Sequence, residues 1–279
     1  MLKRAYVEIT NICNLHCDFC PGTRREKRCI PPAEFRVLAE KLTPHVSYLY
    51  LHVMGEPLLH PQLADILQIA EELGLRVCVT TNGTLLAERA ALLLAAPALH
   101  KLSVSLHSAE GNGTGDLSGY LAAVWDYAFR ASRAGTICAL RLWNIGGADA
   151  RNGEILSFLE SRLGAPPLSL PQPRPGSWRL GERLYLERAE RFDWPDLGAP
   201  ETGARFCLGL RDQIAVLADG TAVPCCLDHE GDIPLGNLLE QDLPDILNSP
   251  RARAVYQGFS QGRPSEPLCR RCGFARRFG

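Results

Sequence analysis

Short apolar runs that alternate with amphipathic stretches constrain the fold of this chain more than any other feature of its sequence. Five runs rich in β-branched and aromatic residues predict strands at residues 5–10, 48–53, 76–81, 101–106 and 137–143. Apolar residues at helical spacing predict helices at residues 33–42, 61–73, 85–95, 120–134 and 153–163. Apolar strands that alternate with helices are typical of a parallel sheet covered by helices, so we expect an α/β fold.

The last part of the chain breaks this alternation. Residues 165–178 are rich in proline and glycine and indicate a loop, whereas residues 184–189 alternate and predict a sixth strand. Residues 193–204 have the composition of a linker. Residues 213–224 carry two β-rich arms around an Asp-Gly pair, which is a strong hairpin signal. We therefore expect two domains, at residues 1–200 and 201–279, the second built from a β-hairpin plus helix.

Three cysteines follow the first expected strand at the spacing Cys-x3-Cys-x2-Cys, as Cys13, Cys17 and Cys20. Thiolates in one loop can ligate a single inorganic centre, and they select zinc or iron–sulfur clusters. The next cysteine, Cys29, is too far along the chain for a ligand-like step, so one coordination position stays open. The chain has 11 cysteines and no export signal ahead of its first strand, so we expect metal ligation in the cytoplasm rather than disulfides.

This loop, with Phe19 before its last cysteine, resembles the defining motif of the radical S-adenosylmethionine (radical SAM) family. Residues 55–61 (GEPLLHP), 80–83 (TTNG) and 105–108 (SLHS) are similar to the family's later cofactor-contacting segments and come in the expected order. Each segment lies at the carboxyl end of an expected strand, where ligands bind in parallel sheets and barrels. The resemblance implies a partial (β/α)6 TIM-like barrel, a [4Fe-4S] cluster on the three cysteines and bound S-adenosylmethionine (SAM).

The resemblance also implies which side chains contact SAM. Gly55 and Glu56 are expected at its amino group and Phe19 beside its adenine. Polar contacts to its ribose and carboxylate are expected from four side chains: Asn82, Ser105, His107 and Arg141. Arginine is a natural forked donor to a carboxylate. Each residue type also has ordinary structural uses, such as a buried ion pair for Arg141.

A second group of cysteines lies near the end of the chain, as Cys207, Cys225, Cys269 and Cys272. Four thiolates suit a fully ligated metal site, and a zinc ribbon would also use them. The pattern is similar to the auxiliary-cluster domains called SPASM and twitch. Because no further cysteines follow Cys272, the shorter twitch type with one auxiliary [4Fe-4S] cluster fits better.

The resemblance implies reductive cleavage of SAM to a 5′-deoxyadenosyl radical that removes a substrate hydrogen. The layout is similar to that of a radical SAM aminocyclitol dehydrogenase, which favours oxidation of a small polar substrate. Two catalytic candidates lie beside Cys225: Cys226 would return a hydrogen atom in an epimerase, and Asp228 would serve as a general base in a dehydrogenase. The same motifs also fit an enzyme that modifies peptides, and a non-catalytic iron–sulfur or zinc binding protein.

Charge and hydropathy narrow the range of partners. The chain has 30 lysines and arginines against 31 acidic residues, so no global attraction to nucleic acid or to an anionic membrane is expected. No apolar run reaches the length of about 18 residues that a membrane span requires. The expected partners are a small-molecule or peptide substrate and an electron donor such as flavodoxin or ferredoxin.

Overall fold

The computed structural model describes residues 2–111 and 115–278, which form two compact units. The first unit contains Met1–Cys13, Pro21–Val77 and Phe192–Gly279. The second contains Asn14–Cys20 and Cys78–Arg191. Among the described residues, no helix is both long and apolar enough to cross a membrane.

The sheet of the first unit joins segments from both ends of the chain. Its strands follow the order β10-β9-β8-β1-β2, with bounds Gly236–Asn237, Thr221–Val223, Gln213–Val216, Arg4–Val7 and Tyr48–Tyr50. β1 pairs in parallel with both β2 and β8, whereas β9 pairs antiparallel with β8 and β10. Alternate residues of β1, Ala5 and Val7, are fully buried.

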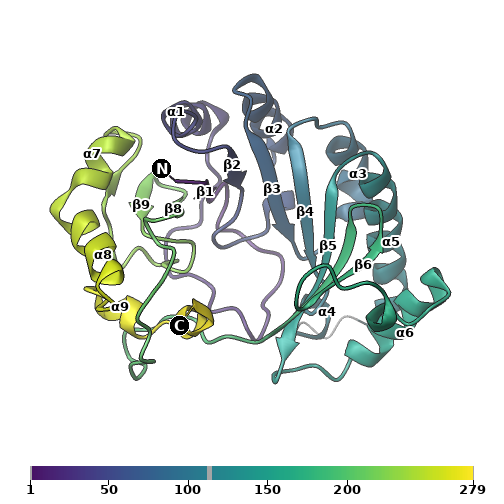
Figure 1. Ribbon diagram of the computed structural model, residues 1–279. Coiled ribbons are helices and arrows are strands. Elements are labelled where there is room, and N and C mark those ends of the chain that lie inside the picture. The colour runs from purple at the N-terminus through teal and green to yellow at the C-terminus, as the bar shows by residue number, and fades with distance from the viewer. Residues whose placement is uncertain (1, 112–114, 279) are drawn as a thin grey trace. The chain divides into compact units, whose positions relative to one another are not determined.

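Helices and short turns complete the first unit, as Figure 1 shows. α1 starts with a proline, whose fixed φ suits the first turn, and buries Phe35, Leu38 and Leu42 on one face. Burial of each such side chain stabilises the fold by roughly 1.5–3 kcal/mol. The helices and 3-10 turns of this unit are α1 (Pro32–Leu42), η1 (Pro57–Leu59), α2 (Leu63–Glu72), α7 (Leu243–Asn248), α8 (Pro250–Ser260), α9 (Pro267–Arg270) and η3 (Gly273–Phe278).

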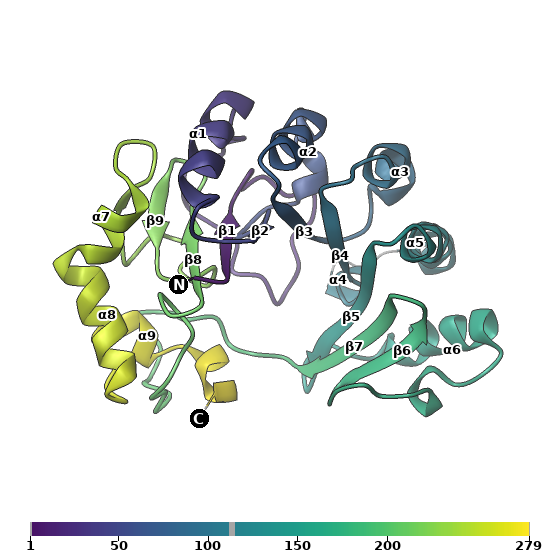
Figure 2. The same ribbon diagram turned by 45° about the horizontal axis from the view of Figure 1, so that its top comes forward.

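The second unit is a sheet with helices on one face. Its strands follow the order β3-β4-β5-β7-β6, with bounds Arg76–Thr81, Leu99–Ser105, Ile137–Ile145, Leu184–Glu190 and Ser177–Gly181, and β3 starts in the first unit. β5 pairs in parallel with β4 and β7, and β6 is an antiparallel edge strand. Figure 2 shows α3 (Leu86–Leu94), α5 (Leu117–Arg133) and α6 (Asn152–Leu163) beside one face. The short α4 (Ser108–Gly111) comes just after β4, and η2 (Pro167–Ser169) comes before β6.

The predicted alternation of strands and helices is confirmed, and the fold is α/β with a mostly parallel sheet. The sixth strand is confirmed as β7, and the hairpin as β8 and β9. Gly220 occupies the turn with a φ of 87°, a conformation that glycine adopts without strain. The loop predicted at residues 165–178 is wrong in part, because η2 lies within it and β6 begins at Ser177. The domain boundary near residue 200 stays a prediction.

Candidate functional site

The loop after β1 carries the three cysteines predicted to bind a cluster. Cys13 ends a segment of the first unit, whereas Cys17 and Cys20 belong to the second. Cys13 and Cys20 are exposed and Cys17 is half-buried, so an inorganic group can reach each thiol. The backbone N–H of Cys20 donates to the carbonyl of Cys17 at 3.0 Å, which closes a turn. Accessible thiols at this spacing fit a cluster that keeps one iron free of protein ligands.

Two asparagines support the cluster loop within the second unit. Nδ2 of Asn82 donates to Oδ1 of Asn14 at 2.9 Å, and Nδ2 of Asn14 donates to Oγ1 of Thr84 at 2.9 Å. Asn82 directly follows β3 and is buried. Its side chain therefore orients the loop that carries two of the cysteines, while its predicted contact with SAM stays a prediction.

Phe19 packs inside the same unit against a buried histidine. The ring centroids of Phe19 and His107 lie 4.7 Å apart. Gly111 lies close to this loop, because a Cβ there would be 3.1 Å from the Phe19 ring and 2.9 Å from the Asp18 carboxylate. Arg191 holds the loop from another side, since its Nη1 lies 3.3 Å from Oδ2 of Asp18. The aromatic side chain before the last cysteine thus has a defined position.

His107 follows β4 and contacts Arg141, which lies within the neighbouring strand β5. Nδ1 of His107 lies 3.1 Å from the carbonyl oxygen of Arg141, so a protonated Nδ1 donates to it. Burial lowers the pKa of His107 to about 4, which keeps its ring neutral at pH 7. The carbonyl of Ser105, the last residue of β4, accepts a hydrogen bond from the Ser108 hydroxyl at 2.7 Å. Ser105 and His107 therefore lie at the carboxyl end of β4, and His107 contacts Arg141 of the neighbouring strand β5.

The guanidinium of Arg141 is engaged within the second unit. Its Nε donates to Oε2 of Glu187 at 3.2 Å and its Nη1 to the Thr80 hydroxyl at 3.3 Å. The guanidinium carbon also lies 4.5 Å from the centre of the Trp143 ring, a cation–π distance. The ion pair that the sequence left open for Arg141 is present, and its contact with the SAM carboxylate stays a prediction.

Gly55 and Glu56 lie in the first unit, against the chain that leads into Cys13. Gly55 has a φ of 77°, and a Cβ there would lie 2.4 Å from the carbonyl oxygen of Thr10. The N–H of Glu56 donates to the carbonyl of Ile12 at 2.8 Å. The Glu56 carboxylate is buried and accepts from the backbone N–H two residues later, which caps η1. These contacts fix the backbone around the first cluster cysteine.

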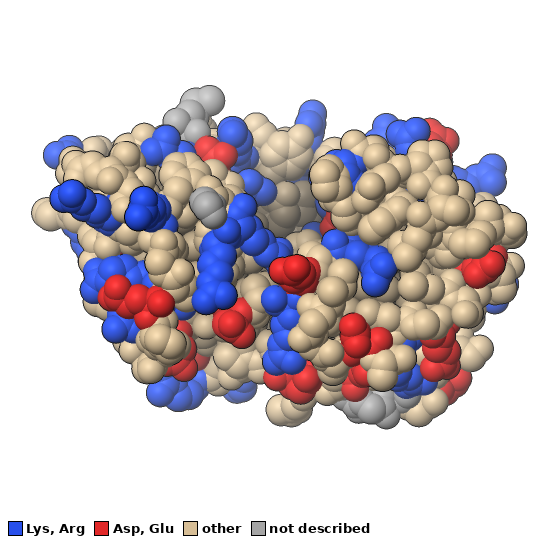
Figure 3. Space-filling model, turned by 60° about the horizontal axis from the view of Figure 1, so that its bottom comes forward, with Lys and Arg blue, Asp and Glu red and all other residues tan. Residues whose placement is uncertain are grey.

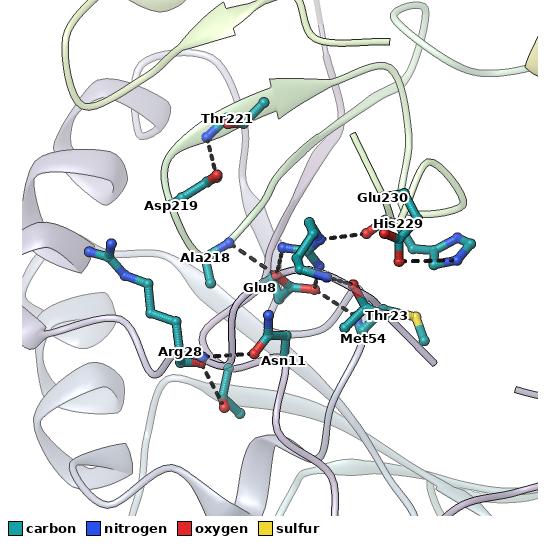
Figure 4. Close-up of polar contacts among 12 residues, drawn as sticks. Glu8, Asn11, Thr23, Arg28, Met54, Ala218, Asp219, Thr221, His229 and Glu230 are labelled. Carbon is teal, nitrogen blue, oxygen red and sulfur yellow. Dashed lines mark hydrogen bonds and ion pairs between the residues drawn. The ribbon is translucent and has the colours of Figure 1, made fainter. Parts of the chain in front are cut away.

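A fully buried carboxylate joins the strands and loops of the first unit. Glu8 accepts from Nη1 and Nη2 of Arg25 at 2.8 and 2.7 Å, and from the N–H groups of Met54 and Ala218 at 3.1 and 3.0 Å. Arg25 donates from Nε to the carbonyl of His229 at 2.7 Å. Figure 4 shows Glu8 at the centre of these contacts. The Glu8–Arg25 pair therefore connects the residue before Gly55, the β8–β9 turn and the segment after Cys225.

Glu8 is absent from the residues predicted from the sequence, although its position carries a signal. It lies between Val7 and Ile9, both fully buried. A carboxylate in an apolar strand is buried only when it is paired, so its position predicts a partner without identifying it.

The four cysteines near the end of the chain belong to the first unit. Cys272 is buried and the other three are half-buried. Burial raises the pKa of Cys225, and negative charge on Cys207, Cys269 or Cys272 raises it further, so the thiols share one neighbourhood. Among residues 2–111 and 115–278, no three potential ligands lie close enough to hold a single ion. A cubane cluster binds each thiolate to a different iron, so a four-thiol set of this kind fits it.

The two predicted catalytic residues lie beside this set. Cys226 shares a hydrogen bond with the Tyr6 side chain, and burial raises the pKa of its thiol to about 12, so the thiol stays protonated. Asp228 accepts from the N–H groups of Asp232 and Ile233 at 2.8 and 2.9 Å, which holds the turn that follows it. Burial raises the pKa of Asp228 to about 6. The catalytic roles of Cys226 and Asp228 stay predictions.

Comparison with known proteins identifies relatives of this chain. The chain is 27% identical over 300 residues to the PqqA peptide cyclase of Streptomyces rochei, covering 95% of this chain and 80% of that protein. The chain spans about a quarter to a third of other curated relatives, with 26% and 36% of their lengths matched. Two solved structures share the fold: BtrN in complex with AdoMet and 2-DOIA (TM-score 0.59, 17% identity, 98% and 93% of the two chains) and Streptococcus suis SuiB bound to precursor peptide SuiA (0.65, 15%, 99% and 70%).

Two family models match the segments that hold the two cysteine groups. The model described as the radical SAM superfamily matches residues 7–133, and the SPASM iron–sulfur cluster-binding domain matches residues 207–273. [4Fe-4S] clusters and SAM are therefore the cofactors of this protein. The accessible three-cysteine loop, the clustered four-cysteine set and these matches agree, and the chain belongs to the radical SAM superfamily as an enzyme with a C-terminal SPASM-type domain.

Proposed function

We propose that this enzyme oxidises a peptide substrate by two electrons. When bound, SAM and the reduced first cluster supply a 5′-deoxyadenosyl radical that removes one hydrogen atom from the substrate. Completing the oxidation requires the loss of one electron and one proton from the substrate. The set of four clustered thiols supports electron uptake, because four protein ligands leave no open coordination position for a substrate. The proposal of a two-electron oxidation rests on this set of four clustered thiols.

The first cluster and SAM would be held by the cysteine loop and by the segment that follows β2. Cys13, Cys17 and Cys20 would each ligate one iron and leave a fourth iron for SAM. Gly55 and Glu56 would hold the amino group of SAM, in a backbone that is already fixed by its contact with Ile12. Because the Glu56 carboxylate caps η1, its backbone carbonyl is the better candidate for that contact.

The remaining predicted contacts belong to the second unit. Phe19 would flank the adenine, supported by its packing against His107. Because His107 is neutral at pH 7, it would act as a hydrogen-bond group rather than as a cation toward the ribose. Asn82 and Ser105 would add polar contacts at the ends of β3 and β4.

The peptide substrate is supported by the relative that matches most of this chain, whose name is a peptide cyclase. The small polar substrate predicted from the sequence is the second candidate. Nucleic acid is not favoured, because acidic side chains lie among the lysines and arginines on the face that Figure 3 draws. An electron donor such as flavodoxin or ferredoxin completes the proposal.

Epimerisation is a further candidate that one observation favours. The thiol of Cys226 stays protonated and is oriented by Tyr6, so an S–H group is available to return a hydrogen atom. An epimerase of this kind transfers solvent deuterium into its product, and Cys226→Ala would stop turnover. Unaltered turnover of that variant excludes the epimerase role.

The proposed function is tested by iron and sulfide content and SAM cleavage under anaerobic, reducing conditions. The Cys13, Cys17, Cys20→Ala triple variant is expected to lose one cluster and all formation of 5′-deoxyadenosine. The Cys269, Cys272→Ala double variant is expected to lose the other cluster and to keep SAM cleavage. The control is Cys29→Ala, a half-buried cysteine outside both sets. Zinc in place of iron, or no cleavage by the wild type, would contradict the proposal.

A further inference from the structure

Four charged side chains meet on one face of the second unit and form what we call the cationic cluster: Lys101, Arg141, Arg174 and Glu187. Lys101 is on β4, Arg141 on β5 and Glu187 on β7, and Arg174 comes from the loop before β6. Along β4, the intervening residues Leu102 and Val104 are buried in the core, so Lys101 lies on the opposite face.

The register of the strands explains why these groups meet. Arg141 is the parallel Cα partner of Glu187, so the two side chains extend from the same level of the sheet. Oε1 of Glu187 lies 3.3 Å from Nζ of Lys101 and 2.6 Å from Nη2 of Arg174, and Oε2 lies 3.2 Å from Nε of Arg141. Three cations thus share a single carboxylate, which leaves two positive charges uncompensated within the cluster.

The electrostatics of the cluster reflect this imbalance. The pKa of Glu187 is lowered, because three neighbouring cations outweigh the burial that would raise it. The pKa of Lys101 is lowered by burial and by repulsion from Arg141 and Arg174, although Glu187 acts in the opposite direction. Because buried charge without a partner is costly, an additional anion would stabilise the cluster.

The cationic cluster is open to solvent on one side. A buried hydroxyl without a hydrogen-bond partner among the described residues projects from the same face of the sheet. The side chain of Arg174 is 64% exposed, whereas that of Glu187 is 9% exposed, so the cluster opens on the arginine side. Ser177 is directly opposite Glu187 in the antiparallel β6–β7 pair, and directly opposite residues project from the same face. The Ser177 hydroxyl is buried and has no hydrogen-bond partner among the described residues. It can donate to a bound oxygen atom.

We propose that the cationic cluster binds an anionic group of the substrate, a carboxylate or a phosphate. Lys101 supplies a point charge, and the two arginines supply planar donors that match the oxygens of such a group. The inference rests on the proposed function only in naming the ligand as substrate. It assigns Arg141 to the substrate instead of to SAM.

The test measures binding of inorganic phosphate and of acetate to the cluster-loaded protein by calorimetry at constant ionic strength. Lys101→Met and Arg174→Gln are expected to weaken binding by about tenfold or more, as loss of one charge-assisted contact does. Arg174 is exposed, so its variant carries little risk of misfolding. The matched control is Arg130→Gln, another exposed arginine with one carboxylate partner, which is expected to bind like the wild type.

The results of this test distinguish phosphate from carboxylate as the bound group, and they distinguish failure of this inference from failure of the proposed function. Tighter binding of phosphate or of acetate identifies the phosphate or the carboxylate as the substrate group. Absence of binding to the wild type, or equal binding by all variants, overturns the inference. Displacement of the probe by SAM also overturns it, because the cluster would then hold the cofactor's carboxylate. SAM cleavage by the wild type is measured separately, so failure of the proposed function is distinguished from failure of this inference.

Discussion

Replacement of Glu8 by glutamine tests how the first unit is held together. The change keeps the size of the side chain but removes its charge and turns one acceptor into an NH2 group. That group faces N–H donors at about 3 Å, as the contacts with Arg25, Met54 and Ala218 show. The Arg25 side chain is only 15% exposed, so it keeps a charge without a partner. Breaking a buried ion pair costs about 3–5 kcal/mol, and we expect a loss of that size in the free energy of unfolding.

The assay is urea-induced unfolding of the anaerobic, cluster-loaded protein, with cluster absorbance as a second probe. The matched control is Glu34→Gln, because Glu34 pairs with Arg28 while their side chains are 33% and 38% exposed. This pair is open to solvent on both sides, and surface ion pairs contribute about 0–1 kcal/mol. The double variant Glu8→Gln, Arg25→Gln should recover part of the loss, because no buried charge remains. A loss for Glu8→Gln no larger than that of the control would refute the reasoning.

Three further predictions concern single positions. Gly55→Ala should cost roughly 1–3 kcal/mol or more and lower the iron content, because the new Cβ would lie 2.4 Å from the Thr10 carbonyl at a positive φ; an unchanged melting temperature contradicts this. Burial lowers the pKa of His107 to about 4, so between pH 6.5 and 4 the unfolded chain binds more protons than the folded protein. The free energy of unfolding therefore decreases as the pH is lowered, by about 3 kcal/mol from pH 7 to pH 4. His107→Gln should flatten this dependence in urea titrations, and an unchanged slope counts against it. Asp116→Ala should cost about 1 kcal/mol, since Asp116 caps α5 through the N–H of Gly119 at 2.9 Å, while Asp116→Asn should cost less in the same assay.

Local pattern was enough to predict most of the elements, because apolar periodicity and turn residues act within short segments. The β8–β9 hairpin is an example, since Asp219 and Gly220 carry their own turn signal. The pairing of β8 with β1 has no such signal, because parallel partners far apart in sequence share no local residue pattern. The last part of the chain therefore completes the sheet that starts at Arg4.

The candidate site also has features that the sequence predicts and features that only the fold reveals. The cysteine spacings and the segments after the strands are visible in the sequence, because ligand chemistry requires fixed residue types. The partners of charged side chains are not visible: Arg141 could be predicted as a carboxylate donor, but its pairing with Glu187 depends on strand register. Glu8 is a similar case, since its burial can be suspected and its contact with Arg25 cannot.

The parallel pairing of β1 with β8 has a consequence for folding during synthesis. Lys3 and Asp212, at the start of this pair, are 209 residues apart and are joined by an ion pair. Until the ribosome has released β8, one edge of β1 exposes unpaired backbone groups, which are a template for association with other chains. Contacts over such a separation also form slowly. In a nascent chain, the three cluster cysteines therefore lie in a loop directly after β1, while the sheet around β1 still lacks β8.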